Sequence, residues 1–193
     1  EEVKQWDAGI KFAAKFKGAK IPTLEEVFRA MQERPERQIY LDLKDVDLNQ
    51  LGRMIDQYQV NEQVIFTHKH QQNCIQMKQI TSDVRTMLWI MGGAGRIKQT
   101  FSEVQNNGFT GLNQVQIHLR LGESRTDWPF ELEQEYVKKV IAETSSAGID
   151  FEVFLYSCED ACVHPLLDEG IRWFATDEPS AFLHSVRRWM RKN

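Results

Sequence analysis

Residues 112–117 read LNQVQI and residues 151–156 read FEVFLY, and a stretch of helical character at residues 131–147 separates them. The two short runs are rich in β-branched and aromatic residues, which is typical of buried strands. Gly148 follows the helical stretch, and a glycine at that point fits a left-handed cap that turns the chain back towards a sheet. This part of the chain therefore predicts a strand, a helix and a second strand, the repeating unit of a parallel sheet.

The same alternation runs through the whole chain without a long low-complexity break. The predicted strands are residues 38–43, 63–67, 85–90, 112–117, 151–156 and 171–176. The predicted helices are the segment that begins at Thr23 and residues 48–59, 70–80, 97–107, 131–147, 159–168 and 179–192. Strands that alternate with helices form a parallel sheet with right-handed crossovers, either open and doubly wound or closed into a barrel.

The strand count favours an incomplete barrel. No Gly-x-Gly-x-x-Gly sequence follows the first predicted strand, which argues against a dinucleotide-binding fold. A TIM (β/α)8-type barrel needs eight βα units and about 250 residues, whereas this chain of 193 residues supplies six units. We therefore expect a single α/β domain over residues 1–193 that lacks the first two strands of a barrel. The opening twenty residues resemble a loop excursion more than a strand.

The overall charge argues against nucleic acid as a partner. The chain carries 24 Lys and Arg residues against 28 Asp and Glu residues, a formal net charge of −4. The densest basic run, residues 187–192, suits the last turn of a helix, where cations complement the helix dipole. No apolar run approaches the roughly 20 residues that a membrane span requires. We expect a protein that binds neither nucleic acid nor a bilayer interior, and its compartment and oligomeric state remain open.

Five motifs in chain order carry a resemblance to a known family. They are WDAG at residues 6–9, IPTLEEV at 21–27, LDLK at 41–44, FLYS at 154–157 and ATDEP at 175–179. In this order and spacing, the chain resembles the glycerophosphodiester phosphodiesterases. The resemblance implies a TIM barrel that hydrolyses a small-molecule glycerophosphodiester to an alcohol and glycerol phosphate with a divalent metal, Mg²⁺ or Ca²⁺.

The family's first two strands carry a His-Arg-Gly motif, two acidic metal ligands and a His-Asp pair, and none of these stands before Gly9. We therefore expect the chain shown to be incomplete at its N-terminus. Two alternatives stay open. One is a non-catalytic barrel that binds a phosphate ester or a partner, and the other is a different barrel enzyme that uses the same mouth.

Asp42 and Lys44 are the main site candidates. They stand two positions apart on a predicted strand, so their side chains point to the same face, which is the barrel mouth at the carboxyl end of the strand. A carboxylate is a hard oxygen ligand for Mg²⁺ or Ca²⁺, and an ammonium group can hold a phosphoryl oxygen. The resemblance assigns the metal to Asp42 and the phosphate contact to Lys44, with Asp in place of the family's usual Glu. The alternative is a buried pair that closes the barrel.

Two further residues are candidates for substrate binding. Tyr156 aligns with a tryptophan that lines the family's pocket, and its ring can contact the alcohol part of a substrate. Arg96 follows the sequence GGAG at residues 92–95, whose backbone amides can form a nest for a phosphate. A flexible turn into the next helix explains the same glycines, and a core tyrosine is nearly as good an interpretation of Tyr156.

Two histidines are candidates for proton transfer. His68 follows the predicted strand 63–67, which places it in a loop on the catalytic side, and a histidine there can move a proton near neutral pH. His118 stands one residue past the predicted strand 112–117 and is a candidate for proton transfer for the same reason. The family takes its acid and base from strands absent here, so His68 is a prediction from chemistry alone.

Overall fold

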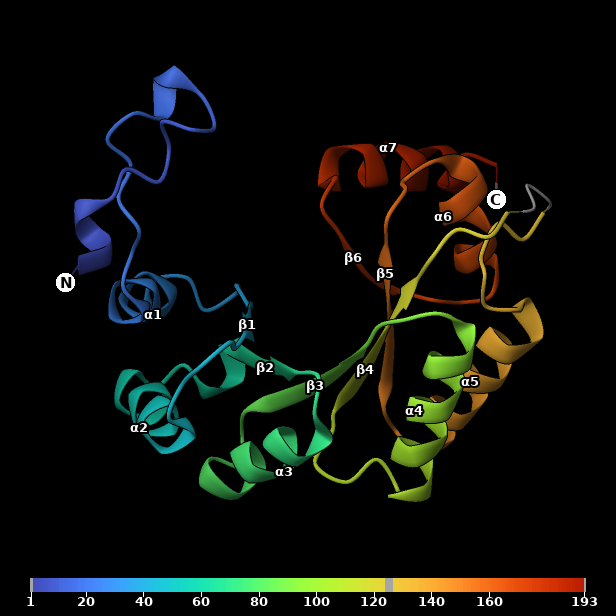
Figure 1. Cartoon of the computed structure of the whole chain (residues 1–193), viewed down its shortest axis with the longest axis horizontal. Helices are drawn as coiled ribbons and strands as arrows, with labels where there is room; N and C mark the ends of the chain where they lie inside the picture. Colours follow the sequence, from blue (N-terminus) through green and yellow to red (C-terminus); the bar gives the residue numbers. More distant parts are fainter. Residues whose placement is uncertain (1, 124–126, 193) are drawn as a thin grey trace.

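The computed structural model describes residues 2–123 and 127–192. Within these residues, six strands form one parallel sheet in which each strand pairs with its neighbour in the sequence (Figure 1). The strands are β1 (Ile39–Asp42), β2 (Val64–His68), β3 (Arg85–Ile90), β4 (Gln114–Leu119), β5 (Asp150–Leu155) and β6 (Trp173–Thr176). The strands that the sequence predicts are confirmed.

A helix follows each strand, and one more precedes the first. The α-helices are α1 (Leu24–Gln32), α2 (Leu48–Tyr58), α3 (Gln71–Ile80), α4 (Ala94–Asn106), α5 (Gln134–Ser146), α6 (Asp160–Asp168) and α7 (Pro179–Met190). Helix α4 begins three residues before the predicted position because Gly93 is its N-cap. Strand β4 continues to Leu119, two residues beyond its predicted end, because Leu119 is still buried against the helices. No helix in the described ranges has the length and apolar content that crossing a bilayer requires.

The two faces of the sheet differ in chemistry, as β4 shows. Val115, Ile117 and Leu119 face the helices and are at most 1% exposed, so they belong to the hydrophobic core. Gln116 and His118 stand at the alternate positions and face the other side, where they line a cavity. Because side chains alternate along a strand, the core-facing residues fix which residues the opposite face presents.

The sheet is strongly curled. The hydroxyl group of Tyr40 on β1 donates a hydrogen bond of 2.8 Å to the carboxylate of Glu152 on β5. In a flat sheet these strands would be separated by four strand spacings, about 19 Å at roughly 4.8 Å each. The contact therefore shows that the sheet wraps around its concave face into a half-barrel. The outer strands, β1 and β6, do not pair with each other within the described residues. The structure thus confirms an α/β fold with six units of a TIM-like barrel.

The segment before α1 forms a separate excursion from the half-barrel (Figure 1). It contains two short 3-10 helices, Glu2–Gln5 and Ala14–Phe16, and no strand among residues 2–23, as the sequence predicts. The carboxylate of Asp7 accepts hydrogen bonds from the backbone N–H groups of Gly9 and Gly18. These bonds, led by the one from Gly18, lower the pKa of Asp7.

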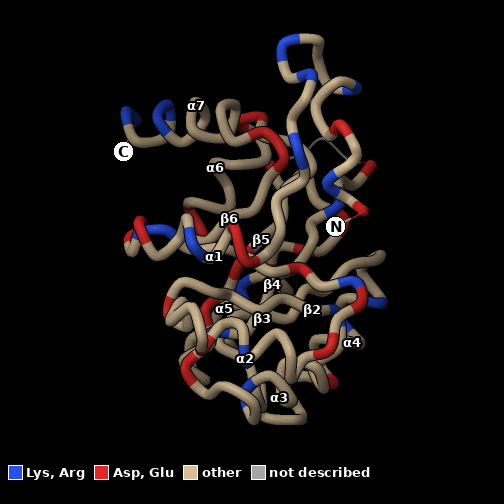
Figure 2. Tube along the Cα trace, turned by 90° about the vertical axis from the view of Figure 1, so that its left-hand side faces the viewer, with Lys and Arg blue, Asp and Glu red and all other residues tan. Residues whose placement is uncertain are grey.

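The basic end of the chain is fastened to the neighbouring helix. Arg187 and Arg188 lie in the last turn of α7, where Figure 2 shows basic residues gathered at the C-terminal end. The guanidinium of Arg188 donates hydrogen bonds to the carboxylate of Asp160 at the start of α6. Ser185 donates another bond of 2.6 Å to the same carboxylate. Arg188 therefore joins α7 to α6, which agrees with a structural role for the basic run.

Gly111 supports a prediction about stability, because its φ is +75° and an added Cβ would lie 2.8 Å from the backbone Cα of Ile75 in α3. We expect Gly111→Ala to lower the free energy of unfolding by about 2–4 kcal/mol, through backbone strain and a clash that α3 cannot relieve. Gly148→Ala is the matched control, since Gly148 has a φ of +68° and open space around it. Gly148→Ala should lower the free energy of unfolding by only about 1 kcal/mol. Equal losses in denaturant unfolding would contradict the close approach of α3.

Candidate functional site

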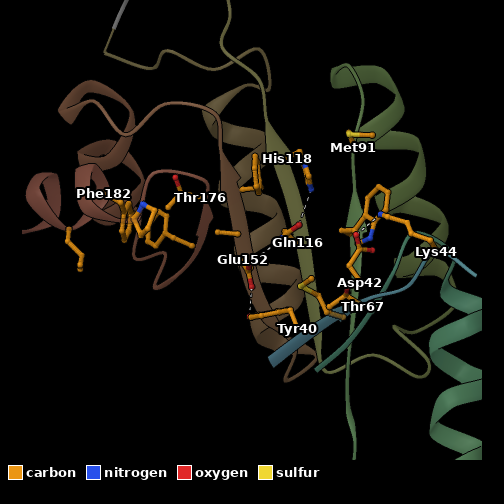
Figure 3. Close-up of a pocket in the computed structure, with 17 residues that line it drawn as sticks. Tyr40, Asp42, Lys44, Thr67, Met91, Gln116, His118, Glu152, Thr176 and Phe182 are labelled. Carbon is orange, nitrogen blue, oxygen red and sulfur yellow. Dashed lines mark hydrogen bonds and ion pairs between the residues drawn. The ribbon is translucent and has the colours of Figure 1, made fainter. Parts of the chain in front are cut away.

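A cavity of about 770 Å³ occupies the concave face of the half-barrel (Figure 3). All six strands contribute to its wall, and α7 closes one side. Its lining residues are Tyr40, Asp42, Lys44, Thr67, Met87, Trp89, Met91, Gln116, His118, Glu152, Phe154, Phe174, Ala175, Thr176, Pro179, Phe182 and Leu183. Carboxyl ends of parallel barrel strands are where TIM-barrel enzymes place their chemistry, so the cavity lies at the expected location.

Asp42 and Lys44 lie together at the rim of this cavity, as the sequence predicts. Asp42 is the last residue of β1, and Lys44 follows two residues later in the loop. The Lys44 ammonium donates a hydrogen bond of 2.7 Å to the Asp42 carboxylate. The side chains are 48% and 81% exposed respectively, so the pair is open to solvent and does not close the barrel.

Asp42 by itself falls short of a metal site. Mg²⁺ and Ca²⁺ require several oxygen ligands around one point. Among the described residues, no group of three or more histidine, cysteine or acidic side chains is placed to hold an ion. The Asp42 carboxylate can supply one oxygen ligand, and its nearest charged partner is a lysine. The side chains described here therefore do not make a metal centre.

Buried polar groups form the floor of the cavity. Glu152 is 2% exposed, and its carboxylate accepts hydrogen bonds from the Tyr40 hydroxyl, the Gln114 amide and the Gln116 amide. Burial raises the pKa of Glu152 above the ordinary value for a glutamate, and the hydrogen bonds partly oppose that effect. The side-chain amide oxygen of Gln114, Oε1, is buried without a hydrogen-bond partner among the described residues. The floor is thus a polar network around one buried carboxyl group.

His118 lies inside the cavity, within β4 and not beyond it as the sequence analysis placed it. Its ring stacks on Phe154 with centroids 4.5 Å apart and lies 5.9 Å from the ring of Trp89. Burial lowers the pKa of His118 below the ordinary value for a histidine. The imidazole is therefore neutral at pH 7 and able to accept a proton.

His68 does not lie in the cavity. It is the last residue of β2, whereas the sequence analysis placed it in the following loop. Thr67 faces the cavity, so the next side chain turns to the helix side. There His68 Nδ1 accepts a hydrogen bond of 2.9 Å from the backbone N–H of His70, and Nε2 contacts the Asn73 amide. His68 therefore lies outside the cavity, although it is near enough to Asp42 to interact with its charge.

Tyr156 lies at the rim next to His118. It follows the last residue of β5 and is 51% exposed. Its hydroxyl lies 3.2 Å from Nδ1 of His118, and its ring packs edge-on against Phe154. Tyr156 therefore contacts His118, which lines the cavity, but it is not itself a lining residue. Its predicted role in substrate binding stays a prediction.

Arg96 lies beside the main cavity, in the first turn of α4. It lines a second cavity of about 510 Å³ together with Lys69 and Arg120. The two cavities share Trp89 and Met91, so they adjoin at the mouth. Arg96 is exposed and lines only this second, outer cavity, whereas Asp42 lines only the first. Its predicted substrate contact would therefore be made from the outer cavity.

Gln116 and Glu152 are polar cavity residues that were not predicted, and His118 was predicted one residue past the end of its strand. A sequence signal for Gln116 and for the place of His118 was present. Residues 114–118 read QVQIH, a strict alternation of polar and apolar side chains. Such alternation predicts one polar face along a strand, and it includes His118 when the strand is extended by one residue.

Comparisons with known proteins support this architecture. No protein-family model matches the sequence, and the search of curated proteins found no significant match. Solved structures do match. A glycerophosphodiester phosphodiesterase from Agrobacterium tumefaciens gives a TM-score of 0.65 at 16% identity, over 94% of this chain and 69% of that chain.

Two other solved structures are similar to the chain. A glycerophosphodiester phosphodiesterase from Parabacteroides distasonis gives a TM-score of 0.62 at 12% identity, over 99% of this chain and 70% of that chain. An Oleispira antarctica phosphodiesterase in complex with the product sn-glycerol-3-phosphate gives a TM-score of 0.65 at 13% identity, over 96% of this chain and 69% of that chain. At such identities the likeness concerns the fold, and it supports an α/β half-barrel with six units of a TIM-like barrel.

Proposed function

We propose that the cavity binds phosphodiesters and hydrolyses a glycerophosphodiester to an alcohol and glycerol phosphate. The observation that carries the proposal is the position of Asp42 and Lys44 on the rim of a cavity that also contains His118. A carboxylate, an exposed ammonium group paired with it and a neutral imidazole around one cavity suit phosphoryl chemistry. The similar structures are phosphodiesterases, which supports the same class of reaction.

Lys44 is the group that would hold the phosphoryl oxygens. Its side chain is 81% exposed and ends in an ion pair with Asp42. Exposed ion pairs contribute only about 0–1 kcal/mol, so a phosphate can draw the ammonium away at little cost. The negative charge that develops on the phosphoryl oxygens then lies next to a cation.

The side of the cavity that β5, β6 and α7 form suits an organic group. Phe154 and Phe174 line it from the sheet, and Phe182 and Leu183 line it from α7. The rings of Phe174 and Phe182 pack with centroids 5.0 Å apart. We infer that the phosphate lies towards Lys44 and that the alcohol portion lies along these apolar side chains.

Metal dependence stays a prediction of the resemblance. A divalent ion, Mg²⁺ or Ca²⁺, would supply Lewis-acid stabilisation of phosphoryl charge when bound. Asp42 would be one of its ligands, and the described residues provide no complete set. This shortage favours a second candidate function, in which the same cavity binds a phosphate ester without hydrolysing it.

Hydrolysis and binding are separated by one experiment with two readouts. The protein is incubated with a glycerophosphodiester, with Mg²⁺ or Ca²⁺ and with EDTA, while ³¹P NMR follows the appearance of a phosphomonoester. Binding of sn-glycerol 3-phosphate is measured in parallel by calorimetry. The proposal expects a phosphomonoester signal, and its loss with EDTA would support the divalent metal that the resemblance implies. Binding without any turnover would replace the enzyme with the binding protein, and neither binding nor turnover would remove both.

A further inference from the structure

A chain of hydrogen bonds runs along the concave face from the floor of the cavity to its mouth, and Figure 3 shows three of its members, Glu152, Gln116 and His118. The amide nitrogen of Gln116 donates a bond of 2.6 Å to Oε1 of Glu152. The amide oxygen of Gln116 lies 2.9 Å from Nε2 of His118. The hydroxyl of Tyr156 lies 3.2 Å from Nδ1 of the same ring.

The direction of every bond in this chain follows from Glu152. An amide NH2 group can only donate, and a carboxylate is an acceptor, so the Gln116 nitrogen must face Glu152. The Gln116 oxygen then faces His118 and can only accept, which requires the proton of the neutral ring to sit on Nε2. Nδ1 is consequently the lone-pair nitrogen, and the Tyr156 hydroxyl donates to it.

The surroundings of His118 keep the ring neutral and fixed. Phe154 stacks on one face and Trp89 lies near it, and neither carries a charge. The titratable groups that face the ring are Tyr156 directly and Glu152 through Gln116. Burial lowers the pKa of His118, so at neutral pH its Nδ1 is available as a base.

We propose that His118 is the proton-transfer residue of this cavity, and that Gln116 and Glu152 are positioning residues that hold its proton on Nε2. This inference rests on the proposed function. Tyr156 is 51% exposed and its bond to Nδ1 is long, so a substrate or water can take its place.

The oxygen of a water molecule forms a bond to phosphorus while Nδ1 of His118 takes one of the water's protons. The bond between phosphorus and the oxygen of the alcohol breaks, and that oxygen takes the proton back from Nδ1. The products are the alcohol and glycerol phosphate, and the ring returns to its neutral form with its Nε2 proton unchanged.

The tautomer of His118 can be measured without reference to activity. ¹⁵N NMR of the imidazole nitrogens, assigned by their loss in His118→Gln, should show the proton on Nε2 in the wild-type protein. Gln116→Leu removes the acceptor and should leave a mixture of tautomers. Glu152→Gln retains an acceptor oxygen for the Gln116 amide and should preserve the Nε2 tautomer. A proton on Nδ1, or identical spectra for wild type and Gln116→Leu, would overturn the positioning role.

Activity supplies the second readout. We expect His118→Gln to lower kcat about 10²-fold, the lower range for loss of a general acid or base, and to abolish the fall in activity on the acidic side of the pH profile. His184→Gln is the matched comparison, because His184 is an exposed residue of α7 that does not line the cavity, and it should keep wild-type kcat. Wild-type turnover in His118→Gln would refute the inference and leave the proposed function standing. If the wild-type protein shows no turnover, the proposed function fails, and the proton-transfer role fails with it.

Discussion

Replacing Lys44 with methionine should lower kcat for glycerophosphodiester hydrolysis by about 10²–10³-fold, the range observed when one group that stabilises transition-state charge is removed. Methionine keeps much of the length of the side chain and loses only its charge and its donors. KM should change much less, because the negative charge to be stabilised grows in the transition state. Steady-state kinetics on the purified variant measures both constants.

Two control variants make this result specific to the cavity. Lys17→Met removes an exposed lysine in the N-terminal excursion, far from the cavity, and should retain wild-type kinetics. Lys44→Arg keeps the charge and should retain more activity than Lys44→Met. A Lys44→Met protein with unchanged kcat would show that phosphoryl charge is stabilised elsewhere. Folding is not at risk, because the Lys44 side chain is 81% exposed.

Replacing Glu152 with leucine should lower the free energy of unfolding by about 2–5 kcal/mol. The substitution leaves the buried amides of Gln114 and Gln116, and the part-buried hydroxyl of Tyr40, without their shared acceptor. Each buried donor left without an acceptor lowers stability by about 1–3 kcal/mol, and local rearrangement of the neighbouring side chains recovers part of this loss. Urea unfolding measures the change, and a loss below about 1 kcal/mol would contradict the central place of Glu152 in the floor.

Glu152→Gln is the matched variant, and it has an expected pH dependence. Burial raises the pKa of Glu152 in the folded protein, so the folded state holds this proton to higher pH than the unfolded state does. The stability tied to that proton is complete below the unfolded pKa, about 4.3, and is lost as pH rises through the folded value. Glutamine carries no such proton, so Glu152→Gln should gain stability relative to wild type as the pH rises from about 4.3 through the raised pKa of Glu152. A constant difference over that range would contradict the raised pKa.

The order of strands and helices was predictable because periodicity is a local property. The run 85–90 and β3 (Arg85–Ile90) coincide, since continuous β-branched and apolar residues between turns leave few alternatives. Element ends were less predictable. Strand β4 extends to Leu119 because burial against helices, which sequence does not display, continues past Ile117.

The site was predictable in part. Asp42 ends β1 and lies on the cavity rim as predicted, whereas Lys44 lies in the loop after β1 and not on the strand, and it is on the same rim as the ion-pair partner of Asp42. His68 was predicted to act in the site and lies outside the cavity, because one residue of extra strand turns its side chain to the helices. His118 gains its place by the same rule, since it shares the face of Gln116.

The role of Glu152 was beyond the sequence. Its partner Tyr40 stands 112 positions earlier in the chain, and only the curl of the sheet brings the two together. A glutamate within an apolar strand gives no sign of which distant donors surround it. The hydrogen-bond chain to His118 starts at Glu152, and the surroundings of Glu152 depend on tertiary structure.

The central claim is that phosphate esters bind at the rim formed by Asp42 and Lys44, and a crystal structure with sn-glycerol 3-phosphate tests it most directly. We predict that the phosphate group lies within hydrogen-bond distance of the Lys44 ammonium, with the glycerol portion inside the cavity that contains His118. A phosphate bound only in the outer cavity beside Arg96, or outside both cavities, would contradict it.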